Sequence, residues 1–173
     1  VTTTVHSSDT TEGTIATSTL VFSPASWNLE RTVTVTGADD ILADGNINYS
    51  IILDTATSTD DVNYSGINPS DVAVTNIDND VVGITLVESG GTTDITEGGA
   101  TDTYTIVLNT EPSANVAVSL SADADSTVST SSIIFTVANW DTAQTITVTA
   151  VNDAFAEGVH SSTITHSVTS TDI

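Results

Sequence analysis

The sequence predicts an all-β protein made of two antiparallel β-sandwiches in tandem. Val and Ile supply much of its aliphatic content and Thr is abundant, a mixture that favours half-buried strands and gives helices little support. The second observation is a repeat: the segment Phe22–Trp27 and the Thr-Val-Thr-Val-Thr run after it recur 113 residues later, as Phe135–Trp140 and a Thr-Ile-Thr-Val-Thr run. A period of this length is typical of a whole small β-domain.

The individual strands are identified by alternating polar and apolar residues between turns rich in Gly, Asn, Asp and Pro. In the first copy we expect them at residues 1–6, 18–22, 31–37, 46–53 and 71–77. In the second copy we expect them at residues 83–87, 102–109, 115–120, 131–135, 143–150 and 159–168. About seven strands per complete domain, with no helical segment between them, indicate an immunoglobulin-like sandwich.

Side-chain patterns within the repeated segments suggest which residues face the core. In the run at residues 32–36 the threonines are expected to face solvent and the valines the core. The aromatic pairs Phe22/Trp27 and Phe135/Trp140 lie at strand ends, and we interpret them as core or corner residues. The alternative for the two tryptophans is that they stack on carbohydrate.

The two copies begin and end at different points of the repeat. Residues 81–113 have no counterpart upstream, because Val1 aligns with Ala114, and the second copy stops before the counterpart of the strand at residues 71–77. We therefore expect an incomplete sandwich at residues 1–80, lacking its opening strands, and a second at residues 81–173, lacking its closing strand. Such ends fit a segment of a longer array, or a processed subunit completed by strands from its neighbours. The expected partners are adjoining repeats of the same polypeptide or copies of it.

The charge of the chain argues against several classes of binding partner. One basic residue, Arg31, stands against 23 acidic residues, and the formal net charge is −22. A field of this sign argues against nucleic acid and anionic membranes as partners. No apolar run approaches the roughly 18 residues of a membrane helix, so we expect no membrane insertion in this segment. The absence of Cys and Lys leaves no residues for a disulfide or a Lys–Asn isopeptide bond.

The acidic residues gather in the predicted loops, at residues 37–45, 78–80, 96–99, 123–125 and 151–158. Calcium takes six to eight oxygen ligands, which several short segments can supply together, and loops at one end of a sandwich provide such segments. The alternative is that these are ordinary solvated turns, because Asp, Asn and Gly favour turns by themselves. Repetition at fixed positions and the lack of nearby cations favour bound Ca²⁺.

Three short motifs are Thr96–Gly98 near the first strand of the second copy, the Thr-Ile-Thr-Val-Thr strand leading to Asp153 and Glu157-Gly158, and the closing Thr75–Asp80. Through these motifs the chain resembles the Calx-beta family, the immunoglobulin-like sandwiches of sodium/calcium exchangers and of large bacterial surface proteins. The resemblance spans essentially the whole chain. It implies calcium ligands at Asp39, Asp40, Asp44, Asp78 and Asp80 in the first copy, and at Glu97, Asp123 or Asp125, Asp153 and Glu157 in the second. Asn152 replaces the counterpart of Asp39, which makes the second site the poorer in carboxylates.

The sequence gives little support for a catalytic function, and we expect that the protein is not an enzyme. The three histidines lie within predicted strands and no Gly-x-Ser-x-Gly nucleophile motif is present. The expected function is that of a structural repeat of an extracellular prokaryotic surface protein: a calcium-rigidified stalk, fibre or filament element at the cell surface. The alternatives are a ligand-binding adhesin module that recognises a glycan or a host protein, and a calcium sensor of the exchanger kind.

Overall fold

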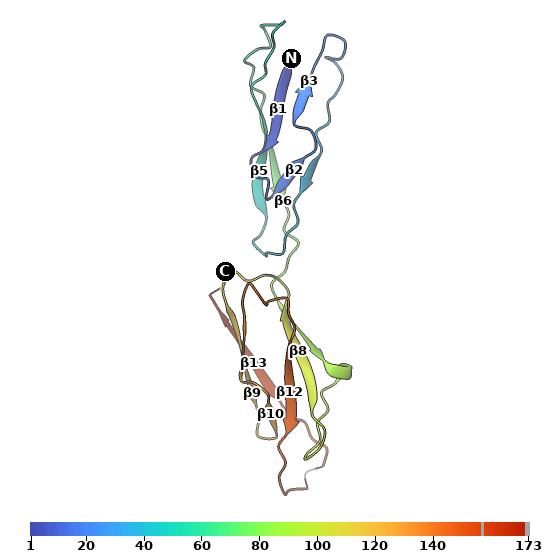
Figure 1. Ribbon diagram of the computed structural model, residues 1–173, viewed down its shortest axis with the longest axis vertical. Helices are drawn as coiled ribbons and strands as arrows, with labels where there is room; N and C mark the ends of the chain where they lie inside the picture. Colours follow the sequence, from blue (N-terminus) through green and yellow to red (C-terminus); the bar gives the residue numbers. More distant parts are fainter. Residues whose placement is uncertain (157, 172–173) are drawn as a thin grey trace. The chain divides into compact units, whose positions relative to one another are not determined.

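The computed structural model describes residues 1–156 and 158–171. In this part of the chain the secondary structure consists of antiparallel strands and one 3₁₀ turn, Ser89–Gly91 (Figure 1). The chain folds as two compact units, Val1–Asp40 with Asp44–Asn79, and Ile41–Ala43 with Asp80–Ile173. No described helix is long and apolar enough to cross a membrane. The prediction of an all-β protein with antiparallel sheets is confirmed.

The first unit has β1 at the centre of its larger sheet. This sheet has the order β3-β1-β5-β6, and β2 and β4 form a separate two-stranded sheet. The strands are β1 Thr2–Ser7, β2 Gly13–Ile15, β3 Thr19–Val21, β4 Val35–Gly37, β5 Ile47–Leu53 and β6 Val72–Asn76.

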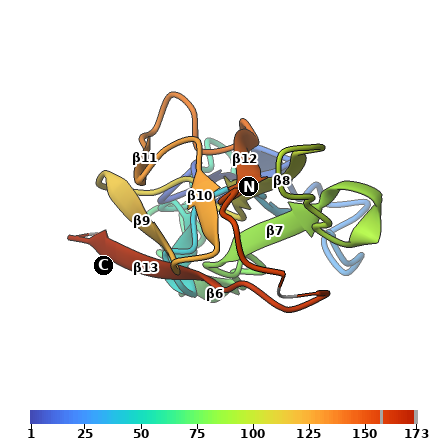
Figure 2. The ribbon, with the colours of Figure 1, turned by 90° about the horizontal axis from the view of Figure 1, so that it is seen from below.

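The second unit has two sheets of similar size, which face each other across one core as in a β-sandwich. Their strand orders are β10-β12-β8-β7 and β11-β9-β13, and Figure 2 shows their strands from one end. The strands are β7 Ile84–Glu88, β8 Asp102–Leu108, β9 Val116–Ala122, β10 Ser126–Val128, β11 Ser132–Phe135, β12 Gln144–Ala150 and β13 Ile164–Ser170.

The repeat seen in the sequence is also a repeat of strand pairing. The order β3-β1-β5 of the first unit recurs as β11-β9-β13, and the pair β2-β4 recurs as β10-β12. Among the described residues, β7 and β8 have no counterpart in the first unit, and β6 has none in the second. The two units therefore share a common set of strands and differ in the strands that flank it.

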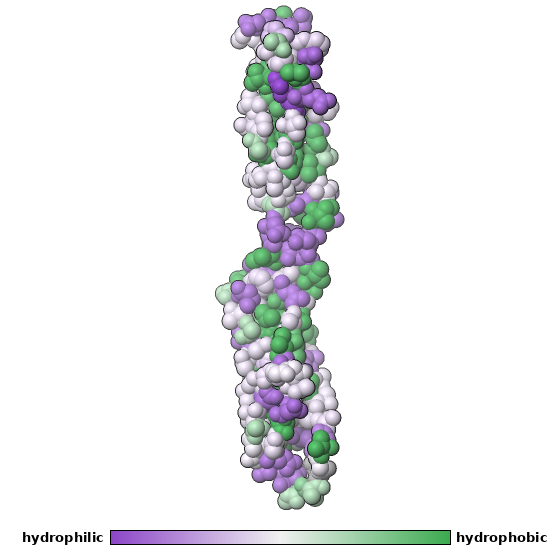
Figure 3. Space-filling model, turned by 90° about the vertical axis from the view of Figure 1, so that its right-hand side faces the viewer, coloured by the Kyte–Doolittle hydropathy of each residue, from purple (hydrophilic) through white to green (hydrophobic). Residues whose placement is uncertain are grey.

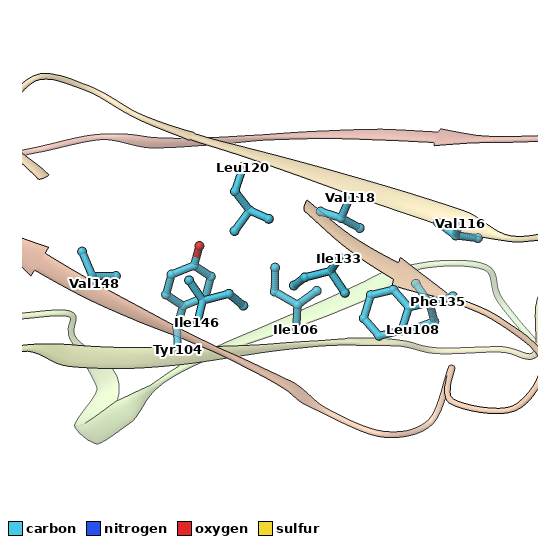
Figure 4. Close-up of a cluster of buried hydrophobic side chains, with 10 residues drawn as sticks. All are labelled: Tyr104, Ile106, Leu108, Val116, Val118, Leu120, Ile133, Phe135, Ile146 and Val148. Carbon is cyan, nitrogen blue, oxygen red and sulfur yellow. The ribbon is translucent and has the colours of Figure 1, made fainter. Parts of the chain in front are cut away.

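Buried aliphatic and aromatic side chains fill the space between the two sheets of the second unit. Strands β8 and β9 lie in opposite sheets, and their alternate side chains point toward one another (Figure 4). Phe135 and Ile146 are 0% exposed, and burying a side chain of this size stabilises a fold by about 1.5–3 kcal/mol. The cluster consists of Tyr104, Ile106, Leu108, Val116, Val118, Leu120, Ile133, Phe135, Ile146 and Val148.

The core of the first unit is smaller and less covered. Its buried cluster is Val5, Leu20, Tyr49 and Ile51, with Ile15, Phe22, Val33, Val35, Leu53 and Val74 partly buried against it. Exposed apolar side chains interrupt the polar surface, so polar and apolar residues are mixed on the face shown in Figure 3.

The predicted strand at residues 31–37 is wrong over residues 31–34, since only Val35–Gly37 forms a strand. The counterpart in the second unit, Gln144–Ala150, is a strand along its whole length because it pairs with β8 from Gln144 opposite Ile106 to Val148 opposite Asp102. The Thr-Val alternation at residues 32–36 still points as expected, with the valines half-buried and the threonines exposed. A suitable sequence therefore does not form a strand here without a neighbour to pair with.

Other strand boundaries also differ from the prediction. The last strand begins at Ile164 rather than at residue 159 and extends to Ser170. The strands Gly13–Ile15 and Ser126–Val128 were not predicted. Each is three residues long, too short to show an alternating pattern, and is defined by its pairing with β4 or β12.

The interpretation of Trp27 as a core or corner residue is wrong, because its side chain is 71% exposed. Trp140, its counterpart, packs against the core of the second unit. The Trp140 carbonyl accepts a hydrogen bond from the Leu108 N–H at 3.1 Å, at the end of β8. Trp27 lies in the unit that has no described counterpart of β8.

Candidate functional site

The acidic loops of the first unit lie close to one another around Asn76, at the end of β6. Its amide nitrogen donates to a Glu12 carboxylate oxygen at 3.2 Å and to the Ala38 carbonyl at 2.7 Å. The Ala38 N–H in turn donates to the Glu12 carbonyl at 2.9 Å. The turn after β1 and the loop that carries Asp39 and Asp40 are thereby joined to the end of β6.

A second contact brings Asp44 to the same strand end. The Gly45 N–H donates to the Asp78 carboxylate at 2.8 Å, and the Asp78 N–H donates to the Asn46 side-chain oxygen at 3.0 Å. Four segments of the first unit therefore converge, and the predicted ligands Asp39, Asp40, Asp44 and Asp78 lie on three of them. The fourth segment carries Glu12.

Glu12 was missed in the sequence. The repeat spacing alone could have identified it, because Glu12 is the counterpart of Asp125. The second unit repeats its backbone contact: the Val151 N–H donates to the Asp125 carbonyl at 2.9 Å, as the Ala38 N–H does to Glu12. Glu12 and Asp125, the acidic residues that follow β1 and β9, therefore have equivalent backbone positions in the two units.

In the second unit the predicted ligands are distributed over three neighbouring segments. Glu97 precedes Gly98, where a Cβ atom would stand 3.6 Å from the Asn152 side chain. Asp153 follows Asn152, and its carboxylate accepts the Phe155 N–H at 2.7 Å. Asp123 and Asp125 lie on either side of residue 124, between β9 and β10.

Asp80 and Glu157 are the two remaining predicted ligands. Asp80 belongs to the second unit, whereas Asp78 belongs to the first. Glu157 lies outside the described residues.

Hydrogen bonds already occupy the Asp123 carboxylate. One of its oxygens accepts from the Ser162 hydroxyl at 2.6 Å and the other from the Thr163 N–H at 2.6 Å. The Ser162 hydroxyl, followed by the Thr163 N–H, holds the pKa of Asp123 below its usual value of 3.8. Asp123 thus ties the start of β13 to the end of β9, a structural role that a calcium ligand would have to share. Asp125 faces His160 instead, with 3.7 Å between the carboxylate and Nε2.

The donor chemistry of these loops fits calcium, because every candidate offers a hard carboxylate oxygen and the neighbouring backbone offers carbonyls. The side chains themselves are not gathered: among residues 1–156 and 158–171, no three or more His, Asp or Glu side chains form a group that could hold a metal ion. The fold brings these acidic segments together but leaves their carboxylates apart.

Comparison of the chain with protein-family models, with curated proteins and with solved structures finds no match.

Proposed function

We propose that this chain is a structural repeat of an extracellular prokaryotic surface protein, in which bound calcium stiffens the β units of a stalk, fibre or filament. The observation that carries the proposal is the repeated convergence of acidic loops in both units. The same backbone contact, from Ala38 to Glu12 and from Val151 to Asp125, holds two of these loops together each time. Because this backbone hydrogen bond occurs at the same position of both repeats, it favours a structural role that the two units share.

The charge supports calcium as the stiffening ion. A net charge of −22 makes the carboxylates of converging loops repel one another, and a divalent cation between them relieves the repulsion. In the first unit the ligands would be Asp39, Asp40, Asp44 and Asp78, together with Glu12. In the second they would be Glu97, Asp125 and Asp153, with Asp123 and Glu157 as further candidates.

The proposed extracellular location follows from the expected affinity for calcium. Sites built from exposed, flexible carboxylates bind calcium weakly, and calcium sites of extracellular modules have dissociation constants of about 10⁻⁴–10⁻³ M. Such sites fill only where calcium is abundant, which favours the cell exterior. The expected partners are adjoining repeats or further copies of the chain, through strand edges of the kind that recruit other strands.

The proposal is tested by melting the full chain in about 10 mM calcium, which is about 10–100 times the dissociation constants expected above, in the same concentration of magnesium, and in chelator at matched ionic strength. Binding to the folded state alone contributes RT ln(1 + [L]/Kd), about 2.7 kcal/mol when calcium stands at 100 times Kd. We expect calcium to raise the melting temperature by several degrees and magnesium to raise it less. Coincident melting curves in calcium and chelator would refute a calcium-stiffened fold.

A matched pair of variants separates the loops from general charge effects. Asp39→Asn with Asp78→Asn removes two candidate ligands, and the control Glu30→Gln with Asp60→Asn removes two exposed acids elsewhere in the first unit. The first pair should lose part of the calcium response and the control should keep it. The mass of the single polypeptide, measured after the protein isolated from its source has been dissociated, then separates the two architectures. A mass near 17.7 kDa indicates an assembling subunit and a much larger one a stalk.

A further inference from the structure

The first unit contains the tripeptide Asn-Tyr-Ser twice, at residues 48–50 and 63–65. Both copies have the form Asn-X-Ser/Thr, with X other than proline, that accepts N-linked glycans. The nearby triplet Asn68-Pro69-Ser70 has proline in the middle and is excluded by this pattern. Because the two tripeptides are identical, their own sequence gives no reason to prefer one asparagine, and the difference must come from where the fold places them.

Asn48 lies in β5, where the fold holds both its side chain and the backbone around it. It stands opposite Thr75 of β6, and its side-chain oxygen accepts a hydrogen bond from the Thr75 hydroxyl at 2.6 Å. The Ser50 N–H donates to the Ser8 hydroxyl at 2.9 Å, and the Ser50 carbonyl accepts from the Ser8 N–H at 2.9 Å. A transferase must take the tripeptide into its own active site, so it reaches Asn48 only after β5 has separated from its neighbours.

Asn63 lies instead in an exposed turn at residues 62–66, between β5 and β6. Its backbone N–H donates to the Asp61 carboxylate at 3.1 Å, and the Tyr64 N–H donates to the Asp61 carbonyl at 3.2 Å. Within residues 1–156 and 158–171, the Asn63 side-chain amide has no hydrogen-bond partner. Asn63 and Ser65 are both exposed, so the amide that would carry a sugar and the hydroxyl of the tripeptide are open to solvent together.

The base of this turn is fixed to the rest of the unit. The Ala56 N–H donates to the Ile67 carbonyl at 2.7 Å, and the Gly66 N–H donates to the Ala56 carbonyl at 2.9 Å. Gly66 has a φ of +87°, in the left-handed region that favours glycine, which reverses the chain at this point. The bonds that hold Asn63 are therefore local to the turn, and the tripeptide can enter an active site without the opening of a sheet.

The side chains on either side of Asn63 are apolar and open to solvent. Val62 is 80% exposed and Tyr64 is 53% exposed. An N-linked glycan is bulky and solubilising, so a saccharide on Asn63 would cover apolar surface that the turn itself leaves open.

We propose that Asn63 is the N-glycosylation site of this chain and that Asn48 stays unmodified in the folded protein. In the transfer, Asn63 Nδ2 forms a bond to C1 of the first sugar of an oligosaccharide carried on a lipid pyrophosphate. The bond between C1 and the pyrophosphate oxygen breaks, the pyrophosphate leaves with the electron pair, and the proton lost from Nδ2 passes to a base of the transferase. The inference rests on the extracellular location in the proposed function, because this modification belongs to secreted chains.

The experiment offers the purified, unmodified full chain to an oligosaccharyltransferase together with a lipid-linked oligosaccharide. Two synthetic peptides, residues 44–54 and 59–69, represent the unfolded tripeptides, and the transferase is one that modifies both. The rate at each asparagine of the chain, followed by mass spectrometry of proteolytic fragments, is divided by the rate of its own peptide. We expect this ratio to be at least about tenfold lower at Asn48 than at Asn63, because access to Asn48 requires local opening of β5.

Variants of the full chain test the tripeptide itself. Ser65→Ala should abolish modification at Asn63, whereas Ser65→Thr, which keeps the hydroxyl, and the control Asn48→Gln should retain it. Equal ratios at the two asparagines, or a lower ratio at Asn63, would overturn the proposal.

The protein isolated from its source supplies the second measurement. Fragments of the chain recovered outside the cell should carry the oligosaccharide on Asn63 and none on Asn48. An unmodified Asn63 in that chain would overturn this inference alone, because the calcium melts use the unmodified protein and do not depend on a glycan. A chain found only inside the cell would overturn the extracellular location and this inference with it.

Discussion

Truncating one phenylalanine in each unit measures how much the two cores differ. Phe22 and Phe135 are repeat counterparts, but Phe135 is 0% exposed whereas Phe22 is only partly buried. Replacing a fully buried Phe by Ala costs about 3–5 kcal/mol of unfolding free energy, because it loses transfer free energy and leaves a cavity. The same change at Phe22 should cost about 2 kcal/mol or less, since part of its ring already contacts water.

Amide hydrogen exchange of the full chain reads both units in one experiment. The amides of Ile106 and Ile146 report on the second unit, and those of Val5 and Ile51 on the first, because these residues are buried in paired strands. We expect Phe135→Ala to speed exchange of the second unit by about two to three and a half orders of magnitude, at 1.4 kcal/mol per tenfold. Phe22→Ala should speed exchange of the first unit by less than about 1.5 orders on the same scale.

The milder change Phe135→Leu serves if the alanine variant does not fold. Equal losses in the two units, or a loss below about 1 kcal/mol at Phe135, would contradict the reasoning, since such a loss is below that of any fully buried Phe→Ala change.

Two further predictions concern acid sensitivity and backbone packing. Hydrogen bonds, first from the Ser89 hydroxyl to Asp102 and from the Ser162 hydroxyl to Asp123, hold both carboxyl pKa values below 3.8. The stabilisation that these hydrogen bonds provide is therefore complete above the unfolded pKa and is lost as the pH falls through the lowered pKa values. Trp140 fluorescence during denaturation measures stability between pH 5 and 2 (chosen limits). The stability of Asp123→Asn should fall less steeply over this range than that of the parent chain. Gly13→Ala should destabilise the first unit by about 1–3 kcal/mol through overpacking, because its Cβ would lie 2.0 Å from the Tyr49 hydroxyl oxygen. The control is Thr14→Ala, a change at the exposed neighbouring residue. Equal melting temperatures of the two variants would contradict this prediction.

Several features of the protein follow from the sequence alone. Alternation locates the longer strands to within a few residues, as at residues 102–108 and 47–53, because an apolar face every second residue is a local property of the chain. The 113-residue spacing relates the strands of the two units, and the same spacing makes Asp125 the counterpart of Glu12. The clustering of acids in loops is likewise readable, since turn residues bound each strand.

Other features depend on strand partners that lie far away in the chain. Residues 31–34 and 144–147 have nearly the same alternation, yet only the second run is a strand, because β8 pairs with it. Trp27 and Trp140 occupy equivalent positions, yet only Trp140 packs against a core, beside the end of β8. The hydrogen bonds that occupy Asp123, and the separation of the other carboxylates, are likewise set by where folded loops place rotatable side chains. The local sequence determines the alternating pattern of each strand. Only the tertiary structure determines which strands have a neighbour, because sheet hydrogen bonds and core contacts join residues that are far apart in the sequence.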